Sequence, residues 1–326
     1  MVNLFVSLAE TESISRVTQP QWTHKDTLTA LIVVLIWGIN FVPMKFALAA
    51  VSPFELGAVR YFFAAVPLCF FIRFPKVRYR WLIATAGFQC IGQFSLLFIA
   101  LQVGMTAAMA SVLFQTQIYF TALWGFLIYR HRPNQLLWLS MTTAAIGLCF
   151  FAVSALSDSS GDSVTGWGIG FMLAASAMWG ANNLIVRQVQ FESPDYNALS
   201  YIVWSSALAV FGYIVIVALW LPDSEKWLHF STWTALSAKT WLSVLFLGWV
   251  ATLVGYALWT HLLKGHHPNQ VAPFSLGVPV VGLLAGLLWL REPIDSWQWL
   301  GTVFVGISLV IVVLGPRRLA KKHSLK

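Results

Sequence analysis

Two copies of a Trp-Gly-x-Asn motif limit what this chain can fold into. The first occupies residues 37–40 and the second residues 179–182, 142 residues later, and the same offset aligns Lys45 with Arg187. Each copy lies inside a long apolar segment, where an amide side chain is costly unless it faces protein or water. One copy alone is explained by a contact between two packed helices. Two copies, one in each half, favour a repeat-built membrane protein with a polar site between its halves.

The composition places the chain among integral membrane proteins. Of its 326 residues, 58% are hydrophobic and 10% are charged, whereas soluble globular proteins carry about 25% charged residues. Strands of a β-barrel would alternate apolar and polar residues, but the apolar segments here are continuous. At ~20 residues per spanning helix, the length accommodates about ten helices. The net charge of +8 therefore bears on membrane topology and not on nucleic-acid binding.

Ten apolar segments are expected to span the membrane, approximately over residues 28–49, 54–71, 81–102, 107–128, 135–154, 168–190, 198–219, 241–263, 271–290 and 297–314. Because five spans per half force the halves into opposite orientations, the expected fold is an all-α integral membrane protein of two inverted five-helix repeats. Its expected parts are an N-terminal tail (1–26), a first repeat (27–154), an external loop (155–166), a second repeat (167–314) and a basic C-terminal tail (315–326).

The Lys and Arg residues of the connecting segments indicate the orientation. If the N-terminus is cytoplasmic, fifteen of them lie inside and only Lys226, Lys239 and Arg291 lie outside. Cytoplasmic loops carry the excess of Lys and Arg in membrane proteins. Both termini are therefore expected in the cytoplasm.

Polar side chains at membrane depth are candidates for a substrate site. Lys45 and Arg60 are expected roughly 6–9 Å below the outer surface, with Glu55 in the same helical hairpin. They form either an ion-paired cluster that holds the hairpin together or a positive site for a substrate carboxylate.

Amide side chains recur on the following two spans. Gln89 and Gln93 share one helix face, and Gln115 and Gln117 follow on the next span. With Asn40 they are expected to converge near the midplane, where alternating-access transporters hold their substrates. Hydrogen bonding between helices without any ligand is the alternative. The expected substrate-binding residues are Asn40, Arg60, Gln89, Gln93, Gln115, Gln117, Trp179, Asn182, Trp204 and Tyr256.

No metal site, cofactor or catalytic cluster is expected. Only Glu55 among the twelve acidic residues lies in or near a span, and the three cysteines lie in apolar segments without metal-ligand spacing. A membrane-embedded transferase, the alternative of another class, would need His, Asp, Glu or Cys clustered at a cavity mouth. The chain is therefore not expected to be an enzyme. It has no ATP-binding motif, so a gradient or the flow of substrate would drive transport.

Several motifs of the chain match those of a known family. The shorter ones are Trp-Gly-Ile-Asn-Phe at 37–41 with Lys45 and Arg60, and the motifs at 75–77, 93–94, 104–105, 110–111 and 115–117. The longer ones are Val-Ala-Thr-Leu-Val-Gly-Tyr at 250–256 and Val-Ala-Pro-Phe-Ser-Leu-Gly-Val-Pro-Val-Val-Gly-Leu at 271–283. With these motifs the chain resembles the EamA branch of the drug/metabolite transporter superfamily, and most closely the bacterial O-acetylserine/cysteine exporters.

The chain departs from this family pattern at one position. The family tends to place a Glu after the fourth span and again after the ninth. Glu292 keeps the second, but Tyr129 and Arg130 stand at the first. These glutamates are expected to make helix-end or loop contacts, so that the fold is retained.

The resemblance implies a multi-pass exporter in the bacterial inner membrane. The expected substrate is a small amino-acid-type metabolite, moved by secondary active or facilitative alternating access between the two halves. The alternative within transport is an exporter of hydrophobic or aromatic compounds and drugs. The expected partners are the metabolite and the lipid bilayer, with no nucleic acid and no obligate protein partner.

The charge bias gives a testable topology. Reporter fusions at Lys326 and within the loop 157–163 should report opposite sides of the membrane, because five spans separate this loop from each terminus. Alkaline phosphatase and green fluorescent protein fusions measure this directly. Activity of both fusions on one side would contradict the inverted arrangement.

Overall fold

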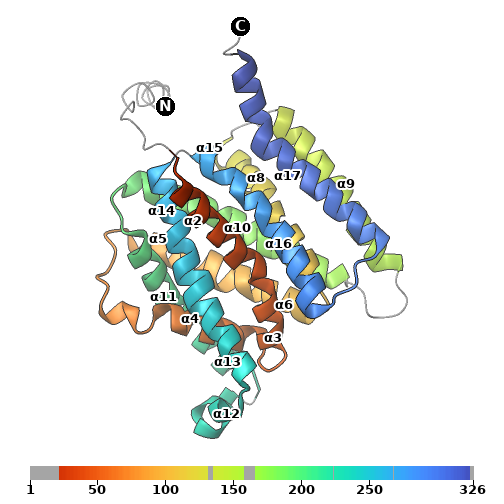
Figure 1. Cartoon of the computed structure of the whole chain (residues 1–326). Helices are drawn as coiled ribbons and strands as arrows, with labels where there is room; N and C mark the ends of the chain where they lie inside the picture. Colours follow the sequence, from red (N-terminus) through yellow and green to blue (C-terminus); the bar gives the residue numbers. More distant parts are fainter. Residues whose placement is uncertain (1–21, 131–134, 158–165, 223, 267, 324–326) are drawn as a thin grey trace.

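Helices make up all of the regular structure in the part of the chain that the structure describes. The computed structural model describes residues 22–130, 135–157, 166–222, 224–266 and 268–323, and it contains no strand within these ranges (Figure 1). The predicted all-α class is confirmed.

The helices of the first half begin with α2 (His24–Ile39) and α3 (Phe41–Leu48), which continue one another. The others are α4 (Pro53–Ala65), η1 (Leu68–Phe70), α5 (Tyr79–Thr85), η2 (Ala86–Gln93), α6 (Phe94–Gln102), α7 (Ala107–Leu113), η3 (Phe114–Thr116), α8 (Gln117–Tyr129) and α9 (Gln135–Ser157). Three of the spans therefore consist of two or three consecutive helical pieces.

In the second half the eighth and ninth spans are divided, whereas the sixth span is the single helix α10 (Gly166–Glu192). The other helices of this half are α11 (Ala198–Trp220), η4 (Ser224–Leu228), α12 (Phe230–Ala235), α13 (Ala238–Leu245), η5 (Phe246–Val254), α14 (Gly255–Gly265), α15 (Pro268–Val271), η6 (Ala272–Leu276), α16 (Gly277–Ala285), η7 (Gly286–Leu290) and α17 (Ser296–His323). By length and composition, seven continuous helices of the described chain could each cross a membrane, and shorter apolar helices cover Phe274–Leu290 and Ser296–Val312.

The second span ends earlier than the sequence analysis placed it. Helix α4 ends at Ala65, six residues before the predicted end at residue 71. Val66 is extended (φ −99°, ψ 133°) and precedes Pro67. A residue before proline is pushed out of the helical region because the proline ring clashes with its backbone. The proline therefore terminates the helix.

Polar side chains fix the beginnings of several helices. Thr23 and Asp26 form a capping box at the start of α2, and Ser52 and Glu55 form another at the start of α4. In such a box each side chain accepts a hydrogen bond from the other residue's backbone N–H, so donors that lack a helical partner are satisfied. Glu55 thus has a structural role at the start of α4.

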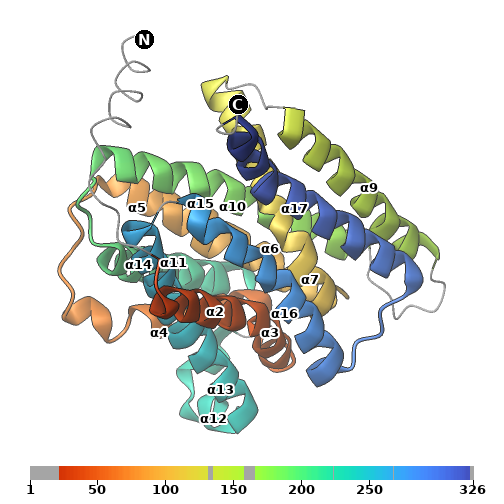
Figure 2. The same ribbon diagram turned by 45° about the horizontal axis from the view of Figure 1, so that its top comes forward.

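The helix contacts follow a two-fold pattern that relates the halves. Helix α2 of the first span packs on α16 of the ninth span and on α14 of the eighth. Its equivalent in the second half, α10, packs on the equivalent spans of the first half, on α8 of the fourth and on η2 and α6 of the third. Helices α4 and α11 pack on each other, as do α9 and α17, and each of these pairs joins equivalent spans of the two halves. Both views show α9 and α17 side by side at one edge of the molecule (Figures 1 and 2).

The two glycines of the repeated motif lie at equivalent contacts. A Cβ atom on Gly38 would lie 2.5 Å from the Cβ of Val281, and one on Gly180 would lie 2.8 Å from the Cβ of Phe120. Real Cβ atoms do not approach neighbours this closely, so each glycine permits its helix to touch the other half. The repeated motif therefore marks where the first span meets the ninth and the sixth meets the fourth.

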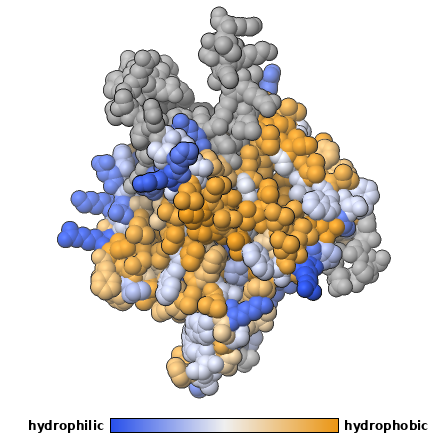
Figure 3. All heavy atoms as spheres, in the orientation of Figure 1, coloured by the Kyte–Doolittle hydropathy of each residue, from blue (hydrophilic) through white to orange (hydrophobic). Residues whose placement is uncertain are grey.

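Apolar side chains form a belt across the face seen in Figure 3. Hydrophobic residues occupy its middle, and hydrophilic residues gather mainly toward its edges. Large apolar side chains such as Phe211, Leu219 and Trp220 are exposed. The lipid chains of a membrane would cover such a belt. Helix α2 begins and α17 ends at one end of the bundle, here called the termini end, and α12 lies at the opposite end, here called the α12 end (Figure 1).

Adding one carbon at Gly38 should destabilise the protein. In Gly38→Ala the new methyl group would press against Val281 and against the carbonyl oxygen of Val278, which is 3.0 Å away. Overpacking of this kind costs about 1–3 kcal/mol. The control is Gly170→Ala in α10, because no atom lies within 4 Å of its Cβ position. Melting temperatures of the purified variants in detergent measure the difference, and equal values would contradict the close contact.

Candidate functional site

A polar cavity of about 1100 Å³ lies between the two halves of the molecule. Its walls come mainly from α2, α4, η2, η3, α10, α11, η5 and α14, and they carry amide, hydroxyl and aromatic side chains. A cavity bounded by both repeats lies where small movements between the repeats would change access to it.

The cavity has its mouth at the termini end. Arg187 and Gln190 near the end of α10 line it, as do Thr260 and Leu263 near the end of α14. The end of α14 lies beside the start of α2, because His266 Nε2 lies 3.2 Å from Asp26 Oδ2. Between the cavity floor and the α12 end the spans carry large apolar side chains that are fully buried. These are Met44, Leu97, Phe98, Met105 and Met109. The cavity is therefore open at one end and closed by apolar packing at the other.

Arg60 supplies the charge at the cavity floor. Helix α4 carries it, and its side chain is 1% exposed. Its Nε and Nη2 atoms donate to Thr252 Oγ1 at 3.2 and 3.1 Å, and its Cζ atom lies 3.9 Å from the ring centroid of Phe94. Its Nη1 atom has no hydrogen-bond partner among the described residues. The guanidinium thus retains a free donor.

Asn40 and Gln93 also have unpaired polar atoms. The Oδ1 atom of Asn40 and both the Oε1 and Nε2 atoms of Gln93 are buried and lack a partner among the described residues. A buried donor or acceptor without a partner costs about 1–3 kcal/mol. Water or a bound ligand would remove this penalty. Together with Arg60 Nη1, these atoms give the floor unused donors and acceptors.

Other polar side chains of the cavity are bonded to one another. Asn182 donates to Gln89 Oε1 at 2.7 Å and accepts from Thr85 Oγ1 at 3.0 Å, and Gln89 donates to Tyr256 Oη at 2.6 Å. Here hydrogen bonding between helices, the alternative considered above, accounts for the amides. This network joins spans 3, 6 and 8.

The fourth span is bonded to backbone groups and to the sixth span. Gln115 donates to the carbonyl oxygen of Ser275 at 2.9 Å, and Ser111 donates to that of Pro279 at 3.3 Å. Gln117 accepts from Asn183 at 2.7 Å. Carbonyl groups of the ninth span therefore serve as acceptors beside its proline residues.

Two π-helices bring functional groups to the cavity. η2 carries Gln89, Cys90 and Gln93, and η5, at the equivalent place in the second half, carries Thr252. π-helices are rare and occur often at functional sites. These π-helices could not be predicted from the sequence, since apolar periodicity scarcely distinguishes a π-helix from an α-helix over one or two turns.

The structure brings nine of the ten expected residues to the cavity. Asn40, Arg60, Gln89, Gln93, Gln115, Gln117, Trp179, Asn182 and Tyr256 line it. Trp204 is not among the lining residues, because its indole N–H donates to the carbonyl oxygen of Ile72 at 3.1 Å and its ring packs on Phe74. Five further aromatic residues line the cavity but were not among the expected ones, because aromatic residues are common in buried helices: Trp37, Tyr61, Phe94, Phe114 and Tyr201.

The cations near the α12 end do not form the cluster considered above. Lys45 Nζ lies 3.8 Å from Glu292 Oε1, whereas Glu55 accepts from Lys226 at 2.9 Å and from Trp227 at 2.7 Å. Arg60 bonds to neither carboxylate. The interpretation of Lys45, Arg60 and Glu55 as one ion-paired cluster is therefore wrong, because each finds its partner on a segment distant in sequence.

Glu292 joins the two halves at the closed end. Its carboxylate oxygens accept from the backbone N–H groups of Ala107 and Ala108 at 2.9 and 3.0 Å, at the start of α7. The predicted helix-end contact of this glutamate is confirmed. Arg291, just before it, and Arg130, at the end of α8, both adopt left-handed backbone (φ 52° and 56°). The backbone is thus alike at both helix ends, but only one is followed by a carboxylate in the sequence.

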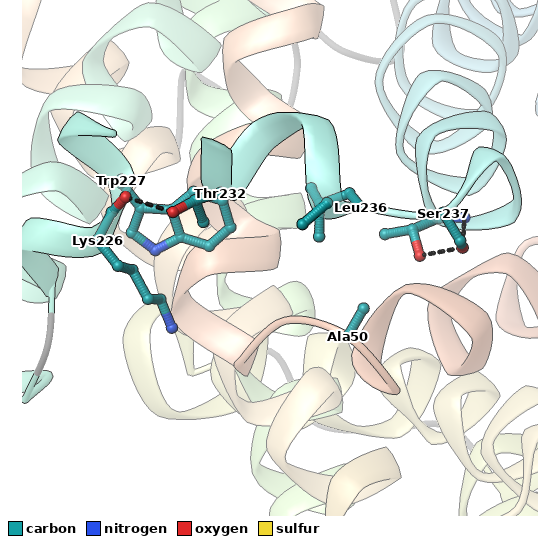
Figure 4. A pocket seen from close by; sticks show the side chains of 8 residues that line it. Ala50, Lys226, Trp227, Thr232, Leu236 and Ser237 are labelled. Atoms are coloured by element: carbon teal, nitrogen blue, oxygen red, sulfur yellow. Dashed lines mark hydrogen bonds between the residues drawn. The ribbon is translucent and has the colours of Figure 1, made fainter. Parts of the chain in front are cut away.

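A second hollow of about 550 Å³ lies at the α12 end (Figure 4). Lys226, Trp227 and Thr232 line it on one side and Ala50 on the other. Lys226 and Trp227 both bond to Glu55, and Thr232 donates to the carbonyl oxygen of Lys226 at 2.6 Å. Because these polar groups are occupied within the protein, the hollow is the weaker candidate for a ligand site.

Comparison with known proteins agrees with this architecture. The model of the EamA-like transporter family matches the chain twice, over residues 25–153 and 166–314. The chain belongs to the EamA-like transporter family. The resemblance deduced from the sequence motifs is thereby confirmed, as is the fold of two inverted five-helix repeats in a multi-pass membrane protein.

Two similar proteins belong to enteric bacteria. The "Probable amino-acid metabolite efflux pump" of Escherichia coli (strain K12) is 34% identical over 297 residues, which cover 90% of this EamA-like chain and 97% of that protein. The protein of the same description from Salmonella typhimurium is 32% identical over 296 residues, with 90% and 97% covered. A crystal structure at 17% identity matches with a TM-score of 0.55 over 90% of this chain and 98% of that one. It shares the fold.

Bonded and unbonded amides of this EamA-like cavity should differ in their contribution to stability. Asn182→Ala removes the partner of Gln89 Oε1 and one of the two hydrogen bonds of Thr85 Oγ1, which keeps its bond to Tyr201 Oη, and should lower the free energy of unfolding by about 1–3 kcal/mol. Asn40→Ala removes an oxygen that has no partner and should cost less. Thermal unfolding of the purified variants in detergent measures both. A larger loss in Asn40→Ala would show that its side chain is needed for packing.

Proposed function

We propose that this protein exports small amino-acid-type metabolites, similar to O-acetylserine or cysteine, across the bacterial inner membrane by alternating access. Both enteric relatives are described as efflux pumps for amino-acid metabolites, which supports export. The transporter family and the polar cavity between the repeats support it further. The two repeats would rock about this cavity, driven by a gradient or by the flow of substrate.

One observation carries the proposal. Three buried side chains at the cavity floor, Asn40, Arg60 and Gln93, hold polar atoms without partners among the described residues. A protein that used these groups only for folding would lose free energy by leaving them unpaired. A metabolite with a carboxylate and further polar groups would supply the missing partners. Arg60 is suited to the carboxylate, since charge-assisted hydrogen bonds are roughly twice as strong as neutral ones.

A second candidate is the export of aromatic or hydrophobic compounds. Trp37, Phe114, Trp179 and Trp259 line the cavity, and its volume of about 1100 Å³ exceeds the needs of a small amino acid. Drug-sized ligands occupy cavities of about 300–1,000 Å³. Such compounds would not need Arg60, so the Arg60 variants described below distinguish the two candidates.

The open mouth would face the cytoplasm if the termini do. The charge bias of the loops supports this orientation, because the cavity opens at the end where α2 begins and α17 ends. The protein would then be in the conformation that loads substrate for export. Release outside would require the α12 end to open, and there Glu292 and Lys45 join the two halves.

Variants of the cavity floor should impair export without a matching loss of folded protein. Asn40→Ala and Gln93→Ala each remove one group for a neutral hydrogen bond and should raise the apparent KM about 2- to 10-fold. Arg60→Gln should nearly abolish export, and Arg60→Lys should be intermediate, because it keeps the charge but loses the planar fork. Efflux of O-acetyl-L-serine from loaded proteoliposomes gives the initial rate, and fluorescence-detected gel filtration gives the amount of folded protein.

Trp204→Phe provides the control for these variants. It removes a hydrogen bond to Ile72 outside the cavity and should leave export per folded molecule unchanged. Unchanged export per folded molecule in Asn40→Ala, Gln93→Ala and Arg60→Gln would contradict a substrate site at the cavity floor.

Glu292→Gln should favour opening at the α12 end. The neutral amide would weaken the charge-assisted bonds to Ala107 and Ala108 and lose the attraction to Lys45. The test uses a background in which Ser replaces Cys69, Cys90 and Cys149 and Ile118→Cys places a single thiol in the cavity. An impermeant maleimide applied from outside should react with this thiol about 10-fold faster when Glu292→Gln is present than when it is absent. Glu55→Gln, the same change at the same end, is the control, and equal acceleration in both variants would indicate general loosening.

A further inference from the structure

The charges that line the cavity are all positive. Among its described lining residues, Arg60 and Arg187 are the charged ones, and Asp, Glu and His are absent. Arg187 is exposed at the mouth, whereas Arg60 is 1% exposed at the floor. The floor therefore carries one buried positive charge, and no lining carboxylate balances it.

This charge distribution affects which ligands the floor accepts. A ligand with one negative charge neutralises Arg60 when it binds. A zwitterion brings an ammonium group as well, so the occupied site keeps a net positive charge in a surrounding of low dielectric constant. Burying an uncompensated charge is costly. The electrostatics therefore favour a carboxylate ligand whose nitrogen is uncharged.

The unpaired atoms of the floor lead to the same class of ligand. Within the described part of the chain, Arg60 Nη1 is a free donor, Asn40 Oδ1 is a free acceptor, and Gln93 has one free acceptor and a free amide donor group. An ammonium group has only donors, so it cannot itself accept a hydrogen bond from Gln93 Nε2. An acylated amine offers one N–H donor and one carbonyl acceptor, which complement a free amide side chain. The carboxylate would occupy Arg60.

From this geometry we infer that the carboxylate is the obligatory group of the ligand and that a charged amine is dispensable, so that N-acylated amino acids are a substrate class of this site. The inference rests on the proposed function and specifies its substrates. Phe94 lies against the Arg60 guanidinium, and Phe114 and Trp179, whose ring centroids are 4.6 Å apart, supply apolar surface for an acyl group or side chain.

Four related compounds test the inference on the purified full-length protein. They are O-acetyl-L-serine, its N-acetyl derivative, and the methyl esters of both, so that amine charge and carboxylate charge vary independently. Binding is measured by calorimetry at pH 6. Methylating the carboxyl group should weaken binding on the order of 10- to 100-fold whether or not the amine is acetylated. Acetylating the amine should leave the affinity of the free acids unchanged or raise it.

Arg60 variants show whether the carboxylate effect arises at this residue. In Arg60→Gln the acids should bind no better than their esters, whereas Arg60→Lys should retain part of the preference. This ratio of acid to ester affinity would not change if Arg60 served only to hold the fold, and the wild-type measurements do not depend on the folding of any variant.

The outcomes separate this inference from the proposed function. A loss of 10-fold or more in affinity on N-acetylation, or equal binding of acids and esters to the wild-type protein, would overturn the inference while leaving amino-acid-type ligands in place. A failure of all four compounds to bind would overturn the proposed function, and the inference with it.

Discussion

The guanidinium of Arg60 lies buried at the centre of the molecule, held by the hydroxyl of Thr252 and the ring of Phe94. Each of these groups comes from a different span, and two of the spans are π-helical near the contact. A buried charge without a counter-charge is costly, so the surroundings must offer water, aromatic rings or a ligand. The cavity fulfils this requirement. The contacts of Arg60 at the cavity floor therefore help to fix the relative positions of α4, η2 and η5.

The pseudo-two-fold arrangement explains how such a floor can exist inside an apolar belt. Gly38 and Gly180 let the halves touch at equivalent places, so the helices meet closely around the cavity without filling it. The polar groups of the two halves are not equivalent, however. Asn182 bonds to Gln89 and Thr85, whereas Oδ1 of its counterpart Asn40 has no partner in the ranges that the structure describes. The first half thus supplies the unpaired polar atoms of the cavity floor. The second half supplies many of the side chains that hydrogen-bond to residues of the first half.

Much of the fold could be predicted from local sequence, because apolar length fixes the spans and four-residue spacing fixes the face that carries Gln89 and Gln93. Long-range partners could not be predicted in this way. Glu55 is the acidic residue nearest to Lys45 in sequence, but Glu292 is its partner in space. Trp204 has the composition of a site residue, yet its indole bonds to a loop carbonyl. Such choices depend on how distant helices pack, which the spacing of residues along one helix does not determine.

The paired π-helices also bear on the history of the chain. A π-turn closes its hydrogen bond over one more residue than an α-turn, so one residue inserted into an α-helix whose two ends stay fixed by their neighbours would produce such a turn. η2 begins seven residues after the start of α5, and η5 begins eight residues after the start of α13. If the two repeats descend from one ancestral gene, one insertion before the gene duplication would explain both π-helices, whereas a later origin would require two separate insertions. A single ancient insertion would then have shaped both walls of the present cavity.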